Sequence, residues 1–401
     1  MKPFTELLNL DAALRKIIER VRPVTETERI RLEEALGRVL AEDVESPIDV
    51  PPFSRAAMDG YAVRAEDTYK ASRENPCILK VIGKVETGGI WKGKIEEDEC
   101  VEISTGAPIP MGADAVVMVE YTKREGDEVK VFRPIYPGGN VSERGTDIKR
   151  GEKILTIGSE LKPSSIGVLA AIGRKEIIVY RKPRVAVIST GYEIRRPGEE
   201  LRPGEIYDIN SYTLSSVIEL NGGIPIRLGI VEDNEERLEE AIRRGLEADM
   251  VVLSGGSSVG SRDLLRNVLE RMGEILFHGI QVKPGKPTLA ALIENKIVLA
   301  MPGYPTSCLS NAYLILRPIL RRVARLPPSR DLKIKAVMGE RYVPSLGRRT
   351  FLTVSLRDGK VYPVFKESGA ITSMSRADGF IVIPENRDLV EEGETVEVYL
   401  F

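Results

Sequence analysis

Three loops of the sequence carry residues suited to binding anions. Ser254–Ser261 combines glycines, which let the backbone approach a ligand closely, with serine hydroxyls at a helix start, where free N–H groups suit a phosphate. Lys283–Pro287 holds two lysines in a turn stiffened by prolines, an arrangement suited to an oxyanion. Met301–Ser307 places proline, threonine and serine at another helix start. Together the loops indicate an enzyme or binding protein that handles a phosphate-bearing ligand and a second anion.

Each loop taken alone also has an ordinary structural explanation. The three explanations are a flexible connector capped by serines, a solvated basic turn and a plain helix N-cap. The first loop matches neither the dinucleotide-binding pattern Gly-x-Gly-x-x-Gly nor the Walker pattern, and Gly285-Lys286 lacks the upstream glycine of a P-loop. The interpretation therefore depends on finding all three loops in one region.

The elements that must position these loops follow from the pattern between Arg184 and Val323. Short apolar runs alternate with stretches of helical pattern, which predicts a doubly wound α/β domain with a parallel sheet. Ligands of such domains bind where the carboxyl ends of strands meet helix starts, and the three loops fall at such points. The expected strands are Val185–Ile188, Ile224–Ile230, Met250–Leu253 and Ile297–Ala300, and the expected helices are Ser211–Leu220, Glu235–Gly245, Arg262–Met272 and Ser307–Val323.

The flanking segments predict further parts of the protein. Asn9–Arg22 carries the apolar stripe of an amphipathic helix, and Leu161–Gly173 is again helical in pattern. Between them short β-type runs alternate with glycine and proline clusters, and the tail is all short β runs, typical of a small barrel or sandwich. We therefore expect a multi-domain α/β protein with a split helical domain (residues 1–46 plus 141–180), an inserted β-rich domain (47–140), the α/β domain (181–327) and a C-terminal β domain (328–401).

Composition excludes several classes of protein. The chain of 401 residues has a net charge of −2, so the global basic surface of a nucleic-acid-binding protein is missing. No apolar stretch is long enough for a membrane span and the first residues lack a signal peptide's apolar region, so we expect a soluble cytoplasmic protein. Three cysteines without paired spacing argue against a disulfide framework and a thiolate metal site. The chain has a single histidine, His278, which excludes a metal centre built from several histidines. A Ser-His-Asp mechanism is possible only if His278 is the base, and its strand-like surroundings favour a structural role instead.

A series of motifs along nearly the whole chain resembles the molybdopterin molybdenumtransferase family, the MoeA family, which includes the E-domain of gephyrin and its plant homologues. Each motif alone is weak, but the series in this order is specific. The matching segments are Pro51-Pro52-Phe53, Ala57–Val63, Ser104–Val117, Arg144-Gly145-x-Asp147, Ser189-Thr190-Gly191-x-Glu193, Ser254-Gly255-Gly256-x-Ser258-Val259-Gly260, Lys283–Pro287 and Pro302-Gly303-x-Pro305.

The resemblance implies a four-part subunit. Its parts are a split helical segment, a β-rich insert, a MogA/MoaB-like α/β domain that binds molybdopterin, and a C-terminal β-barrel. It also implies a homodimer whose active cleft is shared between subunits, with molybdopterin adenylyltransferase as a partner enzyme. The implied reaction converts adenylyl-molybdopterin and molybdate, or tungstate, into molybdenum cofactor and AMP with a divalent ion such as Mg²⁺.

Carried over position by position, the resemblance implies three groups of site residues. The catalytic residues would be Asp59, Thr105, Glu193, Asp249 and Asp263, of which Asp249, Asp263 and Glu193 would also be oxygen ligands of Mg²⁺. The substrate-binding residues would be Gly255, Gly256, Ser258, Pro302, Gly303 and Asp147. The molybdate-binding residues would be Lys283, Lys286, Pro287, Ser307, Arg348 and Ser373, which offer the donors and cations that a hard oxyanion needs. The carboxylates also have ordinary readings as turn, strand-flank or loop charges.

Departures from the family pattern and two other functions stay open. Tyr192 stands where many relatives have Asp and Tyr304 where they have Asn, so the pocket's shape and the choice of oxyanion are undecided. Cys308, next to Ser307, is expected to pack inside its helix rather than touch the metal. The alternatives are a molybdopterin adenylyltransferase, against which the insert and the C-terminal domain argue, and a gephyrin-like scaffold that binds peptides.

Overall fold

The structure is a computed structural model that describes residues 7–255, 261–329, 331–364 and 369–401, without the side chains of residues 261–263. The chain forms two compact units. Unit 1 comprises Met1–Arg29, Gly37–Ala41 and Ile178–Phe401, and unit 2 comprises Ile30–Leu36 and Glu42–Ile177. Two of the four boundaries between them fall within β1 (Thr27–Arg31) and β12 (Glu176–Tyr180), and the other two lie after Leu36 and after Ala41.

Unit 1 contains a six-stranded sheet built from β13 (Arg184–Thr190), β16 (Ile224–Val231), β17 (Met250–Gly255), β18 (Glu274–His278), β20 (Leu289–Ile293) and β21 (Lys296–Met301). The spatial order is β16-β13-β17-β21-β20-β18. The strands β16, β13, β17 and β21 are parallel, as predicted, but β20 is antiparallel to both its neighbours. The difference arises because β20 and β21 form a hairpin whose turn residues, Glu294 and Asn295, have φ of 50° and 62°, as a tight hairpin turn requires.

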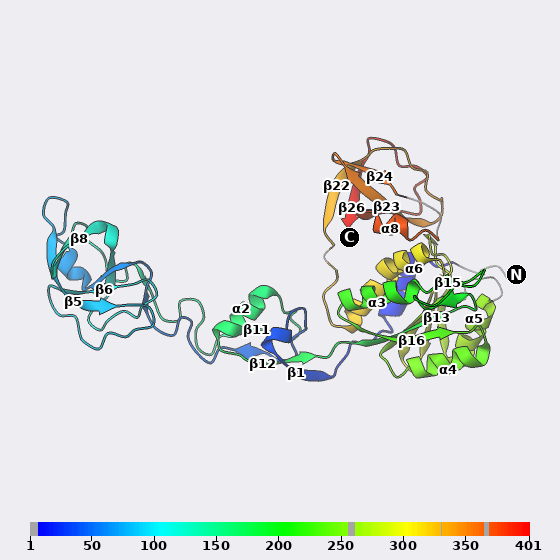
Figure 1. The fold of residues 1–401 in the computed structure, drawn as a ribbon, viewed down its shortest axis with the longest axis horizontal. Helices are drawn as coiled ribbons and strands as arrows, with labels where there is room; N and C mark the ends of the chain where they lie inside the picture. The colour runs from blue at the N-terminus through cyan, green and yellow to red at the C-terminus, as the bar shows by residue number, and fades with distance from the viewer. Residues whose placement is uncertain (1–6, 256–260, 330, 365–368) are drawn as a thin grey trace. The chain divides into compact units, whose positions relative to one another are not determined.

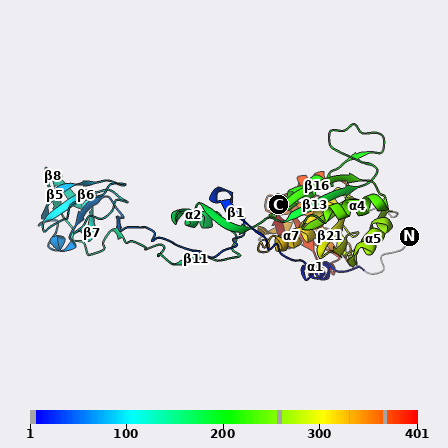
Figure 2. The same ribbon diagram turned by 90° about the horizontal axis from the view of Figure 1, so that it is seen from below.

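Helices cover both faces of this sheet (Figures 1 and 2), which confirms the predicted doubly wound fold. Successive residues of β13 point into different cores: Val185 and Val187 into one, Ala186 and Ile188 into the other. The first core also takes residues from α1 (Leu10–Ile18), α3 (Asn210–Leu220), α6 (Pro305–Asn311) and α7 (Arg317–Val323), and the second from α4 (Glu235–Gly245) and α5 (Ser261–Met272).

The first helix belongs to this core. Asn9 caps α1 by accepting a hydrogen bond of 2.8 Å from the amide of Ala12, and Leu10, Ala13 and Ile17 are buried. Sequence analysis groups this helix with residues 141–180, whereas the structure packs its apolar stripe on the α/β domain, in the same core as Leu320. Helical periodicity predicts that a face is buried but not which domain buries it.

The third loop runs into one long helical stretch. α6 continues without a break into the π-helix η4 (Ala312–Leu316) and then into α7, so the predicted helix Ser307–Val323 begins two residues earlier and contains a π-helical segment. Cys308 is fully buried in this stretch, as expected, and burial raises the pKa of its thiol to about 12.

The tail of the chain forms the predicted barrel. Its strands are β22 (Lys333–Met338), β23 (Arg349–Arg357), β24 (Lys360–Pro363), β25 (Gly379–Ile383) and β26 (Thr395–Leu400), with the short helix α8 (Thr372–Ser375) before β25. The order β23-β24-β22-β26-β25 closes through the pairing of β23 with β25. A strand from the α/β domain, β19 (Val282–Lys283), pairs in parallel with β23 and so joins the two domains.

Unit 2 is β-rich, as predicted for the insert. Its main sheet has the order β7-β4-β6-β5-β9-β8, with apolar cores on both faces: Tyr61 and Val63 of β4 face one core and Ala62 the other. The strands of this sheet are β4 (Gly60–Val63), β5 (Cys77–Val85), β6 (Glu99–Ile103), β7 (Ala115–Met118), β8 (Thr122–Glu125) and β9 (Glu128–Val131). The other elements are η1 (Leu32–Glu34), β2 (Val44–Glu45), β3 (Arg55–Ala56), η2 (Ala65–Thr68), η3 (Val119–Tyr121), β10 (Val141–Ser142), β11 (Lys153–Leu155) and α2 (Pro163–Ala171).

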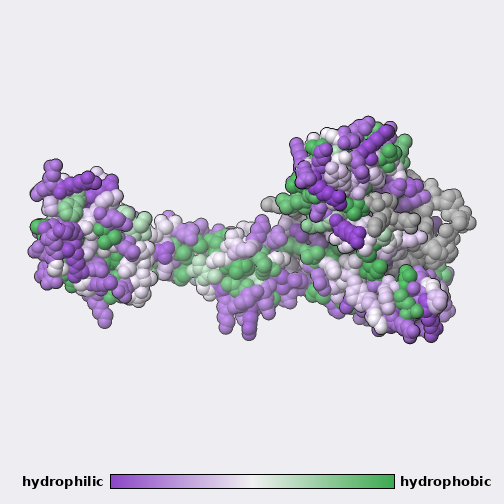
Figure 3. All heavy atoms as spheres, turned by 45° about the horizontal axis from the view of Figure 1, so that its top comes forward, coloured by the Kyte–Doolittle hydropathy of each residue, from purple (hydrophilic) through white to green (hydrophobic). Residues whose placement is uncertain are grey.

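The surface is unevenly apolar. Hydrophilic side chains predominate on the visible face of the C-terminal barrel, whereas hydrophobic side chains gather over the part of unit 2 that holds α2 and β11 (Figure 3). No helix within the described ranges is both long and apolar enough to cross a membrane.

Candidate functional site

The ends of β13 and β17 form the point at the carboxyl edge of the α/β sheet where the chain connections diverge. The two strands are adjacent and parallel, with Thr190 opposite Gly255 at their ends. The connection after β13 leads to β16 on one side, and the connection after β17 leads to β18 on the other side. In open α/β sheets ligands bind where neighbouring connections part in this way, because the loops leave a crevice between them. The glycine-serine loop begins at this point.

Gly255 is required by the packing of the crevice. Its φ is 112°, a conformation that residues with a side chain rarely adopt, and a Cβ atom there would overlap the carbonyl oxygen of Thr190. From the sequence, this glycine is expected to let the backbone approach a ligand closely. In the structure it also lets the ends of β17 and β13 lie close together. Gly256 and Ser258, predicted to cradle a phosphate, lie outside the described residues, as does the side chain of Asp263.

Two carboxylates lie beside this crevice. Glu193 is exposed and folds back over Gly191, where a Cβ atom would be 2.8 Å from its Oε2. Asp233 follows β16 at the same edge of the sheet. Burial raises the pKa of Asp233, a hydrogen bond from Thr190 lowers that pKa, and the charge of Glu193 raises it again, for a net upward shift. The two carboxylates are thus close enough to interact.

Asp249, predicted to be a catalytic residue and Mg²⁺ ligand, lies elsewhere in the domain, and Asp233 is not among the predicted residues. Asp249 precedes β17 and therefore lies at the amino edge of the sheet, opposite the crevice; its N–H donates to the carbonyl of Arg184, the first residue of β13. Both its carboxylate oxygens bind Arg181, at 2.6 and 2.7 Å. The structure therefore places Asp249 in an ion pair with Arg181 at the edge opposite Glu193, and its assignment as a catalytic residue and Mg²⁺ ligand stays a prediction. A carboxylate that follows a parallel strand, as Asp233 does, was the signal to use.

Buried polar groups hold the third loop against α3. The side-chain nitrogen of Asn210 donates to the carbonyl of Gly303 at 2.7 Å, which fixes the loop that contains Pro302. Next to it, the carboxylate of Asp208 accepts hydrogen bonds from the Ser189 hydroxyl at 2.9 Å and from the amide of Ser211 at 3.0 Å. Sequence analysis names neither Asp208 nor Asn210, since nothing in their spacing distinguishes them from helix-capping residues.

The lysine turn, Lys283–Pro287, lies at the same edge of the sheet. It is placed there because β18 ends and β20 begins at this edge: His278 pairs with Leu289, and Leu289 pairs with Ala300 near the end of β21. Lys283, Lys286 and Pro287 are half-buried. The start of the glycine-serine loop at Gly255, the third loop and the lysine turn therefore lie at one edge, as the doubly wound fold predicts.

The C-terminal barrel contacts the lysine turn directly. The ammonium group of Lys283 donates to the hydroxyl of Ser345 at 2.6 Å, and the amide of Arg348 donates to the carbonyl of Ser345 at 3.2 Å. Register adds to this, since Lys283 pairs with Thr350 across β19 and β23. The predicted residue Arg348 thus lies in the turn of the barrel that binds the lysine turn.

Two predicted serines are buried. Ser307 lies in α6, and its carbonyl accepts the hydroxyl of Ser310 at 3.2 Å. The hydroxyl of Ser373 in α8 donates to the carbonyl of Ala370 at 2.8 Å. The segment before α8 approaches the third loop, because a Cβ atom at Gly369 would be 3.9 Å from the ring of Tyr304. The side chains of Ser307 and Ser373 are therefore both buried in the structure.

The remaining predicted residues belong to unit 2. One carboxylate oxygen of Asp59 accepts hydrogen bonds from the amide of Thr105 at 2.6 Å and from its hydroxyl at 2.8 Å. These two bonds lower the pKa of Asp59. Asp147 is exposed, and its amide donates to the carbonyl of Val50 at 3.0 Å. Asp59 and Thr105 form a local pair, and Asp147 lies in a separate turn.

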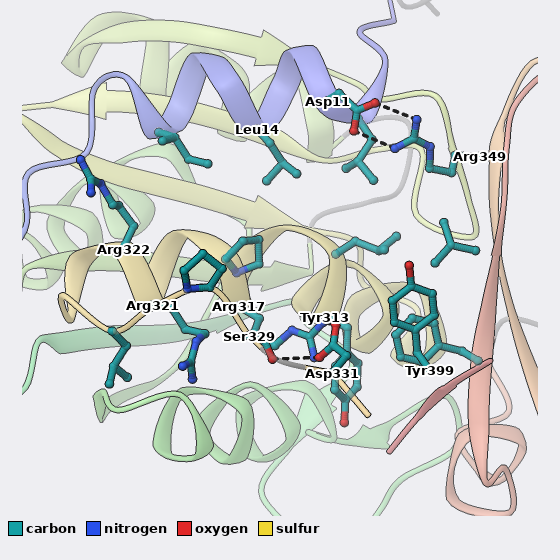
Figure 4. A pocket seen from close by; sticks show the side chains of 18 residues that line it. Asp11, Leu14, Tyr313, Arg317, Arg321, Arg322, Ser329, Asp331, Arg349 and Tyr399 are labelled. Atoms are coloured by element: carbon teal, nitrogen blue, oxygen red, sulfur yellow. Dashed lines mark hydrogen bonds and ion pairs between the residues drawn. The ribbon is translucent and has the colours of Figure 1, made fainter. Parts of the chain in front are cut away.

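A cavity of about 610 Å³ lies elsewhere in unit 1, lined by residues of α1, α7 and the barrel (Figure 4). Two ion pairs line it: Arg349 binds both oxygens of Asp11 at 2.8 Å, and Arg317 binds those of Asp331 at 2.7 and 2.9 Å. Among the residues that line it, none was predicted to belong to the site. The cavity is therefore distinct from the loops at the carboxyl edge.

Comparisons with known proteins cover both units. Three family models match: "MoeA N-terminal region (domain I and II)" over residues 8–173, "Probable molybdopterin binding domain" over 186–322 and "MoeA C-terminal region (domain IV)" over 335–401. A molybdopterin molybdenumtransferase of Haemophilus influenzae is 34% identical over 98% of this chain and 99% of its own length. One of Bacillus subtilis is 33% identical over 98% and 93%. The crystal structure of a molybdopterin biosynthesis MoeA protein from Pyrococcus horikoshii, 44% identical, covers 98% of this chain and 99% of its own, with a TM-score of 0.84.

Proposed function

Because this chain belongs to the MoeA family of molybdopterin molybdenumtransferases, and so is a transferase of molybdenum cofactor biosynthesis, we propose that it inserts molybdate or tungstate into adenylyl-molybdopterin and releases AMP. One observation carries the proposal: three anion-suited loops lie at one edge of the α/β sheet. Two anions have to meet in the reaction, and the loops suited to each of them lie at the same edge of the sheet.

The lysine turn is the proposed oxyanion site. Molybdate is a tetrahedral dianion with hard oxygen atoms, so it is bound by cations and N–H donors rather than by thiolates. Lys283 and Lys286 supply two ammonium groups on a half-buried turn, and Arg348 lies in the adjoining turn of the barrel. Cys308 is buried and protonated at neutral pH, so it takes no part.

The crevice between β13 and β17 is the proposed adenylate site. Its helix start at Ser261 and its glycine-rich entry suit the phosphate of the adenylate. An oxygen of the bound oxyanion attacks the phosphorus of the adenylate. The phosphoanhydride bond to the pterin phosphate breaks, and the attacking oxygen leaves with AMP. A second oxygen leaves the metal as water with the protons of the two thiols, and the two dithiolene sulfurs take the places of these two oxygens.

The carboxylates at this crevice fit a magnesium ion. Glu193 and Asp233 repel each other, as the raised pKa of Asp233 indicates, and a cation between such groups relieves the repulsion. Mg²⁺ commonly takes one or two carboxylates and completes its shell with water and substrate phosphates. Asp263 is the third candidate from the sequence. When bound, the ion would neutralise charge at phosphorus.

We also propose that the protein works as a homodimer. In α2 only Leu169 is buried, although the helix is apolar; Val168 is half-buried, and Ala170 and Ala171 are exposed. An uncovered apolar helix surface of this kind favours a partner. A second copy of the chain is the partner that the family implies, and light scattering on the purified protein would measure the dimer mass. The substrate would come from an enzyme that adenylates molybdopterin.

The test is incubation of the purified protein with adenylyl-molybdopterin, Mg²⁺ and either molybdate or tungstate. We expect AMP release that depends on the oxyanion, together with activation of a cofactor-free molybdenum enzyme. ATP-dependent transfer of AMP to molybdopterin, with no consumption of the adenylate, would instead establish the adenylyltransferase. Tight peptide binding without turnover would establish the scaffold.

A further inference from the structure

The side chain of Asn311, the last residue of α6, is fully buried against the lysine turn. Its amide nitrogen donates to the carbonyl of Gly285 at 2.8 Å and to the hydroxyl of Thr288 at 2.6 Å. The Thr288 hydroxyl donates to the same carbonyl of Gly285 at 3.0 Å. Asn311 and Thr288 therefore fix one backbone carbonyl in the middle of the turn.

The packing around Gly285 leaves no freedom at this point. Its φ is 110°, and a Cβ atom there would overlap the amide group of Asn311. The next residue is also fixed, since the carbonyl of Lys286 accepts hydrogen bonds of 3.0 Å from the amides of Ile280 and Thr288. Lys283 and Lys286 lie on either side of Gly285 in the sequence. The backbone between them is therefore held by two uncharged groups, the amide of Asn311 and the hydroxyl of Thr288.

We propose that Asn311 is a positioning residue for the oxyanion. It holds Gly285 so that Lys283 and Lys286 direct their ammonium groups to the same anion, and it acts through the backbone without touching the ligand. The inference rests on the proposed function, which assigns the oxyanion to the lysine turn. An amide is needed because a carboxylate would face the Gly285 carbonyl with like charge and would also offset one lysine.

The position of Asn311 in α6 also links the lysine turn to the third loop. This helix starts directly after the third loop, whose Gly303 carbonyl is held by Asn210, and it ends at Asn311. The first part of the helical stretch 305–323 is therefore tied to the third loop at its start and to the lysine turn at Asn311. Asn311 sets the distance between the third loop and the lysine turn as well as the shape of the turn.

The experiment measures equilibrium binding of molybdate and of tungstate to the full-length protein by calorimetry, comparing Asn311→Ser with a matched control, Asn221→Ser. Asn221 is also buried in the α/β domain, and its side-chain amide donates to the backbone carbonyl of Val217 at 2.8 Å. It lies at the C-terminal end of α3, however, and makes this bond within the helix rather than to the lysine turn. We expect Asn311→Ser to weaken oxyanion binding about tenfold, the loss that one unsatisfied buried group produces. Asn221→Ser should change the affinity less than about twofold while lowering the melting temperature similarly.

A second variant covers the case in which Asn311→Ser does not fold. Thr288→Val keeps the shape of the side chain and removes the other hydrogen bond to the Gly285 carbonyl. We expect it to weaken oxyanion binding in the same way, and the double variant to lose less than the product of the two single losses, because both act on one carbonyl.

Unchanged oxyanion affinity in Asn311→Ser and Thr288→Val, or an equal loss in Asn221→Ser, would overturn the inference. AMP release tests the proposed function separately. A protein that binds the oxyanion in an Asn311-dependent way but releases no AMP would refute the function and leave the positioning role intact.

Discussion

The ammonium group of Lys283, in the α/β domain, donates a hydrogen bond of 2.6 Å to the hydroxyl of Ser345, in the C-terminal barrel. The strand that ends with this lysine, β19, is paired with β23 of the barrel. The lysine turn is therefore shaped by two domains, and its geometry depends on both. We expect changes on the barrel side to affect oxyanion binding.

Ser345→Ala tests this dependence. The variant removes the acceptor of Lys283, so the ammonium group loses its fixed position, and we expect the KM for molybdate to rise about threefold to tenfold with the KM for adenylyl-molybdopterin unchanged. Ser355→Ala is the matched control, since that buried hydroxyl of the barrel has no partner among the described residues. Steady-state AMP release at varied molybdate measures both variants; equal effects would refute the link.

Lys286→Ala should separate the two anion sites. Loss of one ammonium group removes a charge-assisted hydrogen bond worth about 1.5–3 kcal/mol, so oxyanion binding should weaken at least tenfold while adenylyl-molybdopterin binding stays nearly intact. The exposed Lys335 of β22 gives the control, Lys335→Ala. Calorimetry with each ligand reads the two affinities. If both affinities fall together in Lys286→Ala, the lysine turn is not a separate oxyanion site.

Gly255→Ala should be severely destabilising. The new Cβ atom would overlap the Thr190 carbonyl between the central strands, and φ is unfavourable as well, so we expect a loss of more than about 3 kcal/mol in the free energy of unfolding. Gly198 has a similar φ of 96° with open space around it, so Gly198→Ala should cost only about 1 kcal/mol. Urea unfolding compares them. Similar losses would mean that backbone conformation alone accounts for Gly255.

Asp249→Asn should affect stability and not magnesium binding. Burial raises the pKa of Asp249, but hydrogen bonds from Arg181 and the Arg184 amide outweigh burial, so the pKa lies below its ordinary value of 3.8. A lowered carboxylate pKa contributes stability above the unfolded value, and that stability is lost as pH falls through the folded pKa. We expect the variant to lose about 2 kcal/mol at pH 7, and the difference from the unaltered protein to shrink as pH falls below 3.8 and to vanish below the folded pKa. A weaker Mg²⁺ dependence of AMP release would restore Asp249 to the site.

Asp233 should determine the pH at which magnesium binding is lost on the acid side, here called the acid limb of the pH profile. Its pKa is raised, first by burial, and a carboxylate binds the ion only when it is ionised, so binding falls as pH drops through that pKa. Thr190→Val removes a hydrogen bond that lowers the pKa and should move the limb to higher pH. Glu193→Gln removes a charge that raises the pKa and should move it to lower pH. Thermal stabilisation by Mg²⁺ across the acid range measures both; shifts in the same direction would contradict this arrangement.

The sequence by itself determined the layered architecture and the edge at which the site lies. Strands that alternate with helices fix a doubly wound sheet, and glycines and lysines that follow those strands must then lie at its carboxyl edge, as Gly255 and Lys283 do. By the same reasoning Asp249, which precedes β17, lies away from that edge, and Asp233, which follows β16, lies at it.

Only the tertiary structure decided which distant residues support the site. The hairpin of β20 and β21, the packing of α1 on the α/β sheet, the bond from Lys283 to Ser345 and the amide of Asn311 beneath Gly285 all join segments that local patterns treat separately. The spacing of apolar residues predicts whether a side chain is buried, because burial depends on which face of its own helix or strand it occupies. It does not record the partner, because a hydrogen bond or a packing contact depends on where two remote segments meet after folding.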